Sequence, residues 1–299
     1  MALLIITTIL WAFSFSLIGE YLAGGVDSYF SVLMRVGLAA LVFLPFLRTR
    51  GQSPRTIVLY MLVGAMQLGI MYLLAFRAYL YLTVSEFLLF TVFTPLYITL
   101  IYDLLSGRKL RWGYLLSAAL AVLGAAIIRY DKVSDHFWTG LLLVQLSNLC
   151  FAIGMVGYKR LMEVRPMPQH NAFAWFYVGA FIVAVAAWFM LGNAQKLPTT
   201  TLQWSVLVWL GVVASGLGYF MWNYGATQVD AGTLGIMNNV HVPAGLLVNL
   251  AIWQEQPHWP SFISGALVIL ASLWVHRRWV APHSGQTADD RRRGSAQSE

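Results

Sequence analysis

Ten apolar segments, each about 20 residues long, occupy most of this chain of 299 residues. A helix needs about 20 apolar residues to cross the roughly 30 Å of hydrocarbon in a bilayer, so each segment is long enough to span a membrane. We predict spanning helices at residues 2–22, 28–47, 56–76, 82–103, 112–130, 137–158, 171–191, 202–224, 231–253 and 260–279. The predicted fold class is an all-α integral membrane protein with ten transmembrane helices.

The composition agrees with that prediction and excludes other classes of protein. Hydrophobic residues make up 59% of the chain and charged residues 10%, and the mean hydropathy is +0.68, whereas soluble domains carry about 45–50% apolar and about 25% charged residues. Cys150 is the only cysteine, which excludes a disulfide framework and a cysteine-based metal site. Since the sequence also lacks the His-Glu-x-x-His, Gly-x-Ser-x-Gly and Walker A patterns, we expect no enzyme activity, no cofactor and no metal.

Lysine and arginine residues are distributed unequally between the two sides of the predicted membrane. With the N-terminus placed inside, 14 of the 19 lie in inner segments, four lie in outer segments, and Arg35 lies within a span. Inner segments of membrane proteins carry the excess of positive charge, so both termini are predicted to be cytoplasmic. The formal net charge of +7 is therefore a topology signal, and we expect no nucleic acid partner. Residues 280–299 are predicted to form a disordered cytoplasmic tail.

The chain contains an internal repeat. A shift of 148 residues aligns the third to fifth predicted spans with the eighth to tenth without a gap, and the matching pairs are Ala78 with Ala226, Ser85 with Thr233 and Pro95 with Pro243. A shift of 138 residues pairs the first span with the sixth through Phe13 with Phe151 and Gly19 with Gly157, and the loops absorb the difference of ten residues. The halves, residues 2–130 and 137–279, hold five predicted spans each. Because five is odd, the second half enters the membrane from the opposite side, which gives the inverted repeat of many secondary transporters.

Pro95 and Pro243 lie near the middle of their predicted helices. A proline inside a helix removes one hydrogen bond and displaces the carbonyl four residues earlier, here those of Thr91 and Asn239. In hydrocarbon a freed carbonyl needs a polar partner from the protein or from a water-filled cavity. We therefore expect a cavity near these two kinks, lined by the first, third, fourth, sixth, eighth and ninth spans.

Four short motifs resemble those of the EamA domain in the drug/metabolite transporter superfamily. They are Ile9-Leu10-Trp11-Ala12-Phe13-Ser14-Phe15-Ser16 in the first span, Leu33-Met34-Arg35-Val36-Gly37 in the second, Thr94-Pro95-Leu96 in the fourth and Trp253-Gln254-Glu255 after the ninth. Gln254 stands where that family commonly has glycine, and Ser106-Gly107 stands where it has Gly-Glu. The resemblance implies two inverted five-helix EamA repeats and a transport function without catalysis.

The first 15 residues, Met1 to Phe15, resemble bacterial biotin transporters in the carboxylate, amino acid and amine transporter group of this superfamily. That resemblance implies biotin uptake by a multi-pass protein of the bacterial inner membrane. Composition and spacing indicate only a carrier of small solutes, so two alternatives stay open. One is an exporter of amino acids or related small metabolites on the same fold, and the other is a membrane enzyme or lipid scramblase. The expected partners are a small carboxylate substrate, biotin by resemblance, and the lipid bilayer.

Polar side chains inside the predicted spans are candidates for substrate binding, because each is costly in hydrocarbon. Arg35 could hold a carboxylate through two parallel hydrogen bonds, or it could tie its helix to neighbouring carbonyls. Asn238 and His241 are three residues apart and share one helix face. Asn148 in the sixth span adds a donor and an acceptor, and Trp222 in the eighth adds an apolar wall. These five residues form the predicted substrate-binding set.

Two ionisable side chains are candidates for proton coupling. Glu86 lies near the outer end of the fourth predicted span, and His241 lies near the centre of the ninth. Imidazole titrates near neutral pH, which favours His241. The alternatives are an interfacial ion pair of Glu86 with Arg77 and a neutral histidine that is hydrogen-bonded to a neighbouring helix.

Overall fold

The computed structural model describes residues 2–105, 120, 123, 127, 135–229, 237, 238, 240, 244–254, 259, 260, 263, 264, 267, 268, 270, 271 and 274. Within these ranges the regular elements are helices, without a β-strand. Seven helices are long and apolar enough to cross a membrane, and a shorter apolar helix covers Ala244–Trp253. The predicted spans at 112–130 and 260–279 and the start of the span at 231–253 lie largely outside the described residues, as do His241 and Pro243.

The seven long helices follow the order of the predicted spans. α1 covers Ala2–Tyr21, and α2 covers Ser28–Phe43 and continues into the 3₁₀ turn η1 at Leu44–Phe46. The third helix combines α3 (Pro54–Gly64), η2 (Ala65–Ile70) and α4 (Met71–Ala78), and the fourth consists of α5 (Val84–Thr91) and α6 (Thr94–Leu105). They are followed by α8 (Asp135–Val164), α9 (Gln169–Leu191), the turn η4 (Ala194–Lys196), α10 (Thr201–Trp209), η5 (Leu210–Leu217), α11 (Gly218–Thr227) and η6 (Asn249–Trp253).

Two of these helices share an interruption that the sequence analysis did not predict. η2 and η5 are π-helical segments, in which each turn is wider than in an α-helix and the regular i to i−4 bonding is locally replaced. A shift of 148 residues places η2 at 213–218, which overlaps η5 at Leu210–Leu217. The third and eighth predicted spans therefore have the same internal architecture.

Neighbouring polar residues set where two of the helices begin. The Thr83 side chain accepts a hydrogen bond from the Glu86 backbone N–H, and the Glu86 carboxylate accepts one from the Thr83 N–H, so α5 starts with a capping box. Thr200 and Gln203 form the same arrangement at the start of α10. Both caps satisfy backbone donors that a helix start leaves without partners.

The fourth helix is interrupted between α5 and α6 at residues 92–93, so Pro95 is the second residue of α6. Pro95 has no N–H for the Thr91 carbonyl, and the Thr94 hydroxyl donates to that carbonyl at 2.7 Å. The preceding carbonyl, that of Phe90, accepts a hydrogen bond from Asn148 Nδ2 of α8 at 2.9 Å. Side chains therefore satisfy the backbone groups that the break exposes.

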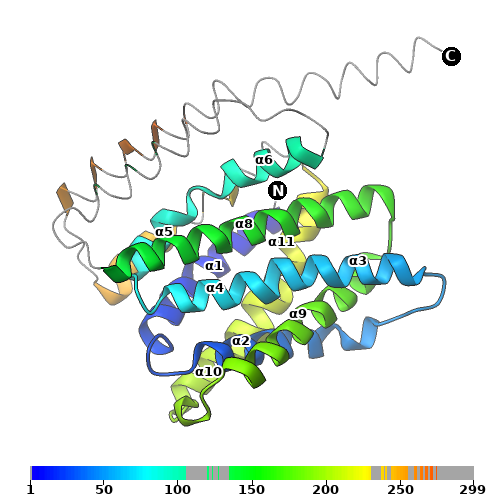
Figure 1. The fold of residues 1–299 in the computed structure, drawn as a ribbon, viewed down its shortest axis with the longest axis horizontal. Helices are drawn as coiled ribbons and strands as arrows, with labels where there is room; N and C mark the ends of the chain where they lie inside the picture. The colour runs from blue at the N-terminus through cyan, green and yellow to red at the C-terminus, as the bar shows by residue number, and fades with distance from the viewer. Residues whose placement is uncertain are drawn as a thin grey trace.

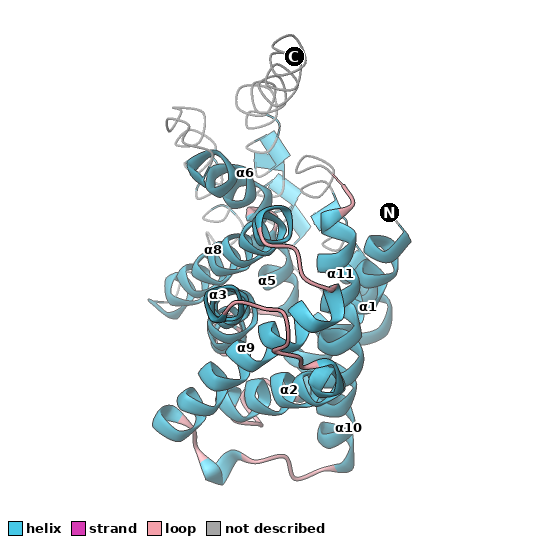
Figure 2. Cartoon of the chain, turned by 90° about the vertical axis from the view of Figure 1, so that its right-hand side faces the viewer, coloured by secondary structure: helices cyan, strands magenta, loops and turns pink. Residues whose placement is uncertain are grey.

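The long helices pack side by side in one bundle (Figure 1), which Figure 2 shows from its end. α3 packs against α9 and α2 packs against η5, while α1 packs against α11 and α8 packs against α4. In the predicted repeat, spans one, two and three correspond to spans six, seven and eight. Under that correspondence the first contact is equivalent to the second, and the third is equivalent to the fourth. The helix contacts are thus related as a repeated unit would relate them.

Two glycines bring α3 and α9 into backbone contact. A side chain on Gly64 would collide with the Phe176 carbonyl, and a side chain on Gly179 would collide with the Met61 carbonyl. Small residues let membrane helices approach closely, and the resulting van der Waals packing drives their association in lipid. These contacts fix α9 against the third helix.

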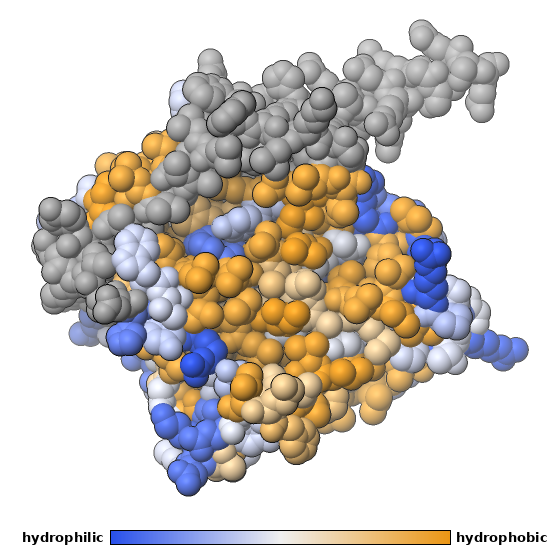
Figure 3. All heavy atoms as spheres, in the orientation of Figure 1, coloured by the Kyte–Doolittle hydropathy of each residue, from blue (hydrophilic) through white to orange (hydrophobic). Residues whose placement is uncertain are grey.

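The surface divides into an apolar band and polar ends. Figure 3 shows hydrophobic side chains across the middle of the bundle and hydrophilic side chains toward its ends. Leu41 is 63% exposed and Leu142 is 59% exposed. A contiguous apolar surface of this kind is unusual on a soluble protein and matches the hydrocarbon of a bilayer.

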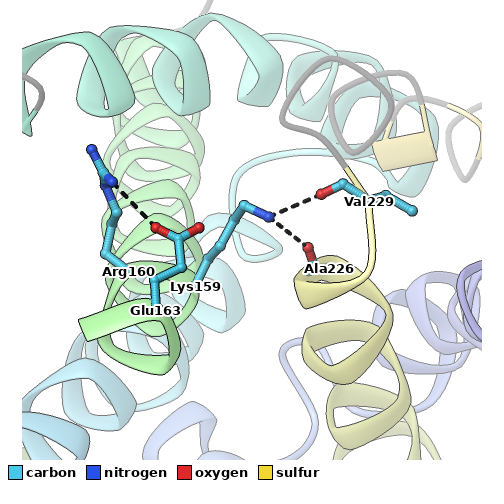
Figure 4. Close-up of polar contacts among 5 residues, drawn as sticks. All are labelled: Lys159, Arg160, Glu163, Ala226 and Val229. Carbon is cyan, nitrogen blue, oxygen red and sulfur yellow. Dashed lines mark hydrogen bonds and ion pairs between the residues drawn. The ribbon is translucent and has the colours of Figure 1, made fainter. Parts of the chain in front are cut away.

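Basic residues gather where α8 and α11 end (Figure 4). Lys159 Nζ donates to the Ala226 carbonyl at 3.3 Å and to the Val229 carbonyl at 2.9 Å, so this cation lies at the negative C-terminus of α11. Arg160 forms an ion pair with Glu163 at 3.2 Å. Because these charged residues continue the helix, α8 extends beyond the end at residue 158 that the apolar pattern predicted.

Candidate substrate site

A cavity lies inside the bundle. Its lining comes from α1, α2, α4, α5, α6, α8 and α11 and from residue 238 of the predicted ninth span. Apolar and aromatic side chains dominate this lining, together with one charged side chain, Arg35, and two side-chain amides, those of Asn148 and Asn238. Sites for small molecules usually combine a few polar groups with an apolar lining, so the cavity has the character of a small-molecule site.

Arg35 supplies the charge of the cavity and is 3% exposed. Its Nε donates to Ser215 Oγ at 2.6 Å, and the Tyr72 hydroxyl forms a hydrogen bond of 2.9 Å with the same oxygen. The guanidinium carbon lies 4.2 Å from the centre of the Tyr72 ring, within cation–π distance. A guanidinium has five N–H donors, and the hydrogen bonds found among the described residues use the one on Nε. Arg35 is therefore held in place while most of its donors stay available.

The π-helical segment η5 connects several side chains at the cavity. Trp11 Nε1 donates to the Ala214 carbonyl at 3.0 Å, and the Tyr177 hydroxyl donates to the Ser215 carbonyl at 2.6 Å. Carbonyls in a π-helical turn lose their regular α-helical partners, so they can accept from side chains on other helices. η5 thereby fixes an aromatic wall and the residue that holds Arg35.

Aromatic rings surround the cavity in two groups. The Trp11 ring lies 4.6 Å from the centre of Tyr219 and 6.4 Å from that of Phe151. The Phe87 ring stacks on Tyr79 at 4.3 Å. Tyr79 directly follows α4 and Phe87 lies in the first turn of α5, so this second group lies near the ends of those helices and the first group lies deeper. Both groups offer flat apolar surfaces to a ligand.

The two amides differ in how they are satisfied. Asn148 is 5% exposed and uses its Nδ2 for the Phe90 carbonyl, which leaves its Oδ1 as an acceptor in the lining. Asn238 is 2% exposed, and its Nδ2 has no hydrogen-bond partner among the described residues. The cavity therefore presents an amide acceptor and a buried amide donor.

Other predicted site residues lie outside this lining. Trp222 is fully buried behind Trp11, with 5.0 Å between the ring centres, and its Nε1 donates to Met155 Sδ at 3.3 Å. Glu86 belongs to the capping box of α5 and does not line the cavity. His241 lies outside the described residues. In the part of the chain that the structure describes, no group of three His, Cys, Asp or Glu side chains could hold a metal ion.

Sequence reasoning missed Tyr72 and Ser215, although they hold Arg35. Serine and tyrosine are common in membrane helices, so neither residue marks a site on its own. The repeat offers a signal, because a shift of 148 residues pairs Ser215 with Gln67. Gln67 is fully buried and forms two hydrogen bonds, of 3.0 and 3.1 Å, with Asn223. Both halves thus place a buried polar residue within a π-helical segment.

Comparisons with known proteins agree with a transporter fold. The model of the EamA-like transporter family matches residues 1–130 and 138–277. A protein from Escherichia coli (strain K12) named "Biotin transporter" is 83% identical over 299 residues, which covers 100% of both chains. A protein from Pseudomonas aeruginosa named "Probable biotin transporter" is 55% identical over 279 residues, which covers 93% of this chain and 97% of that protein.

A solved structure supports the same conclusion at the level of the fold. The solved structure, described as "Crystal structure of protein", is 17% identical in sequence to this chain and superposes on it with a TM-score of 0.64. The match covers 92% of this chain and 95% of the other chain. The family model matches both halves of this chain, and the Escherichia coli and Pseudomonas aeruginosa proteins are identical to this chain at more than half of the aligned positions. This chain therefore belongs to the EamA-like transporter family.

Proposed function

We propose that this chain is a secondary transporter that carries biotin into the bacterial cell across the inner membrane. The curated relatives named as biotin transporters match nearly the whole chain. Arg35 is the structural observation that carries the proposal, because this charged side chain is 3% exposed, lines a largely apolar cavity and makes no ion pair with a described residue. A buried charge is costly without a partner, and the carboxylate of a substrate would supply one.

The cavity has the groups that a molecule such as biotin requires. Its carboxylate is ionised at neutral pH and matches the planar guanidinium of Arg35, which can donate two parallel hydrogen bonds. Its apolar body suits the aromatic surface of Trp11. We propose Asn148, Asn238 and His241 as further binding groups, while Trp222 acts from behind by supporting the Trp11 ring.

Uptake of labelled biotin by whole cells, with and without the gene, tests this function. We expect uptake to require the gene, and Arg35→Gln to lower it more than about tenfold, because truncating one partner of a buried charged pair costs about 2–5 kcal/mol. Arg50→Gln is the matched control, since Arg50 is exposed in the segment between α2 and α3. Uptake that is independent of the gene, or full uptake by the Arg35→Gln variant, would contradict the proposal.

We further propose the full architecture of ten spanning helices in two inverted repeats, residues 2–130 and 137–279, followed by a cytoplasmic tail at 280–299. The family model matches the chain in two segments with nearly the same bounds. The shared π-helical segments and the equivalent helix contacts of the two halves also support a repeat. An inverted repeat places a substrate site near the middle of the membrane, between the halves.

A further inference from the structure

We propose that the two side-chain amides of the cavity bind the ureido group of the substrate, while Arg35 binds its carboxylate from another helix. Asn238 Nδ2 donates to the ureido oxygen, and Asn148 Oδ1 accepts from a neighbouring ureido N–H. This assignment rests on the proposed biotin transport, and it adds which end of the substrate meets which residue.

Asn238 supplies the strongest reason for a ligand acceptor. Asn238 is one of the residues that line the cavity, and its Nδ2 is buried and lacks a hydrogen-bond partner within the described ranges. A buried donor that stays unsatisfied costs free energy, and proteins satisfy nearly all such groups. A carbonyl oxygen in the cavity would satisfy this donor, and the ureido oxygen is the amide-like oxygen that biotin offers.

Asn148 has its orientation fixed by the backbone of α5. Its Nδ2 donates to the Phe90 carbonyl at 2.9 Å, which an oxygen in the same position could not do. The Oδ1 is therefore the other polar atom of this amide, and it can accept a hydrogen bond but cannot donate one. A ureido group has N–H donors beside its carbonyl, so it complements one amide donor and one amide acceptor.

The charged residue and the amides lie on different helices of the lining. Arg35 lies on α2, which packs against α9, η5 and α4, and its partners Ser215 and Tyr72 come from η5 and α4. Asn148 is bonded to α5 through the Phe90 carbonyl.

Residues that follow Asn238 in the sequence also meet α5. A side chain on Gly245 would contact Leu88, and Asn249 Nδ2 donates to Ser85 Oγ at 3.5 Å. A substrate that contacts both Arg35 and the amides therefore needs a carboxylate and an amide-like group, and biotin carries these two groups at its two ends.

Competition against labelled biotin uptake tests the assignment. Three unlabelled competitors are compared: biotin, its analogue with sulfur in place of the ureido oxygen, and its carboxamide, which lacks the carboxylate charge. For the unmodified protein we expect a preference of about tenfold for oxygen over sulfur, the equivalent of one good hydrogen bond. We expect a larger preference for the carboxylate over the carboxamide.

Two variants separate the two ends of the substrate. Asn238→Leu keeps the size of the side chain, and it should reduce the oxygen-to-sulfur preference to within about twofold while the carboxylate preference stays unchanged. Arg35→Gln should reduce the preference for the carboxylate over the carboxamide while the oxygen-to-sulfur preference stays unchanged. Asn193→Leu is the control, because Asn193 is an exposed residue before η4, outside the cavity, and should keep both preferences.

The outcomes distinguish this assignment from the proposed function. If the unmodified protein takes up biotin but binds the oxygen and sulfur forms equally, the assignment is overturned whether or not any variant folds. Equal weakening of both forms in Asn238→Leu would also overturn it and would make Asn238 a structural residue. Absence of biotin uptake by the unmodified protein would reject the proposed function itself.

Discussion

At the scale of single residues, Ser215 positions Arg35. Its hydroxyl accepts from Arg35 Nε at 2.6 Å and shares a hydrogen bond of 2.9 Å with the Tyr72 hydroxyl. Ser215→Ala leaves these two buried groups without that partner, at a cost of about 1–3 kcal/mol each. We expect the KM of biotin uptake to rise about five- to thirtyfold, the equivalent of 1–2 kcal/mol, when uptake is normalised to the amount of protein in the membrane.

Ser205→Ala is the matched control for this prediction. Ser205 donates to the Thr201 carbonyl of its own helix at 2.9 Å, on an exposed face of α10, so the variant should keep the KM of the unmodified protein. A KM that Ser215→Ala leaves unchanged would show that Arg35 needs no support from η5.

Residue types inside apolar spans identified part of the candidate site. Arg35, Asn148 and Asn238 stand out because a charge or an amide in hydrocarbon needs a reason, and the structure brings all three to one cavity. Trp11 and Trp222 are both large apolar side chains, and the sequence does not show which of them lines the cavity. Only packing shows that Trp11 lines the cavity and Trp222 lies behind it.

At the scale of helices, the contact between α3 and α9 depends on Gly64 and Gly179. An added methyl group at Gly179 meets the Met61 carbonyl, and backbone cannot turn aside as a flexible side chain can. We expect Gly179→Ala to separate the two helices and to destabilise the protein by about 1–3 kcal/mol, as overpacking usually does. The unfolding temperature of the detergent-purified protein measures this loss.

Gly25→Ala controls for the substitution itself. A side chain at Gly25 would have its nearest neighbour at 3.6 Å, the end of the Gln203 side chain, which is ordinary van der Waals contact. Its unfolding temperature should equal that of the unmodified protein. If Gly179→Ala also unfolds at that temperature, the contact does not limit stability.

Helices were predictable where long apolar runs define them, and their interruptions were predictable only in part. Pro95 indicated a kink in the fourth helix, and the structure interrupts that helix at residues 92–93, shortly before it. The hydrogen bond from Asn148 Nδ2 to the Phe90 carbonyl was not predictable, because it joins residues that are 58 positions apart in the sequence. The π-helical segments η2 and η5 contain no proline that would indicate an interruption. They depend on contacts with other helices, which the sequence of one segment does not reveal.

At the scale of the whole molecule, we predict that both termini are cytoplasmic. The Asp27 N–H donates to the Lys196 carbonyl at 2.7 Å, which places the segment before α2 and the segment before α10 at one end of the bundle. The Tyr60 hydroxyl donates to the Arg165 carbonyl at 3.0 Å and joins α3 to the segment after α8. The inner end carries the excess of basic residues, so the first pair of segments should be periplasmic.

Single cysteines introduced into a Cys150→Ser background test this topology. Asn193→Cys should react with an impermeant thiol reagent in intact cells, and Arg165→Cys should react only after the membrane is opened. Asn193 is exposed and follows α9, and Arg165 is partly exposed and follows α8. The opposite labelling pattern would reverse the orientation of the whole bundle.

The whole-molecule prediction that goes furthest is proton-coupled uptake. Biotin is an anion at neutral pH, and moving one negative charge into a cell with a negative interior costs about 2.3 kcal/mol per 100 mV. One proton carried with it makes the step electroneutral, so a pH gradient can drive accumulation. Arg35 cannot carry that proton, because a guanidinium does not deprotonate in proteins.

Two residues can carry the proton, and matched variants separate them. Glu86 forms the capping box of α5 outside the cavity lining, and glutamine also serves in such a box, so Glu86→Gln should keep proton-driven accumulation in proteoliposomes. His241 shares a helix face with Asn238 in the predicted ninth span, and His241→Phe should abolish the acceleration by an inward proton gradient. Sodium should be dispensable for the unmodified protein. Accumulation that follows sodium instead would reject proton coupling, and loss of coupling in Glu86→Gln with intact coupling in His241→Phe would transfer the role to Glu86.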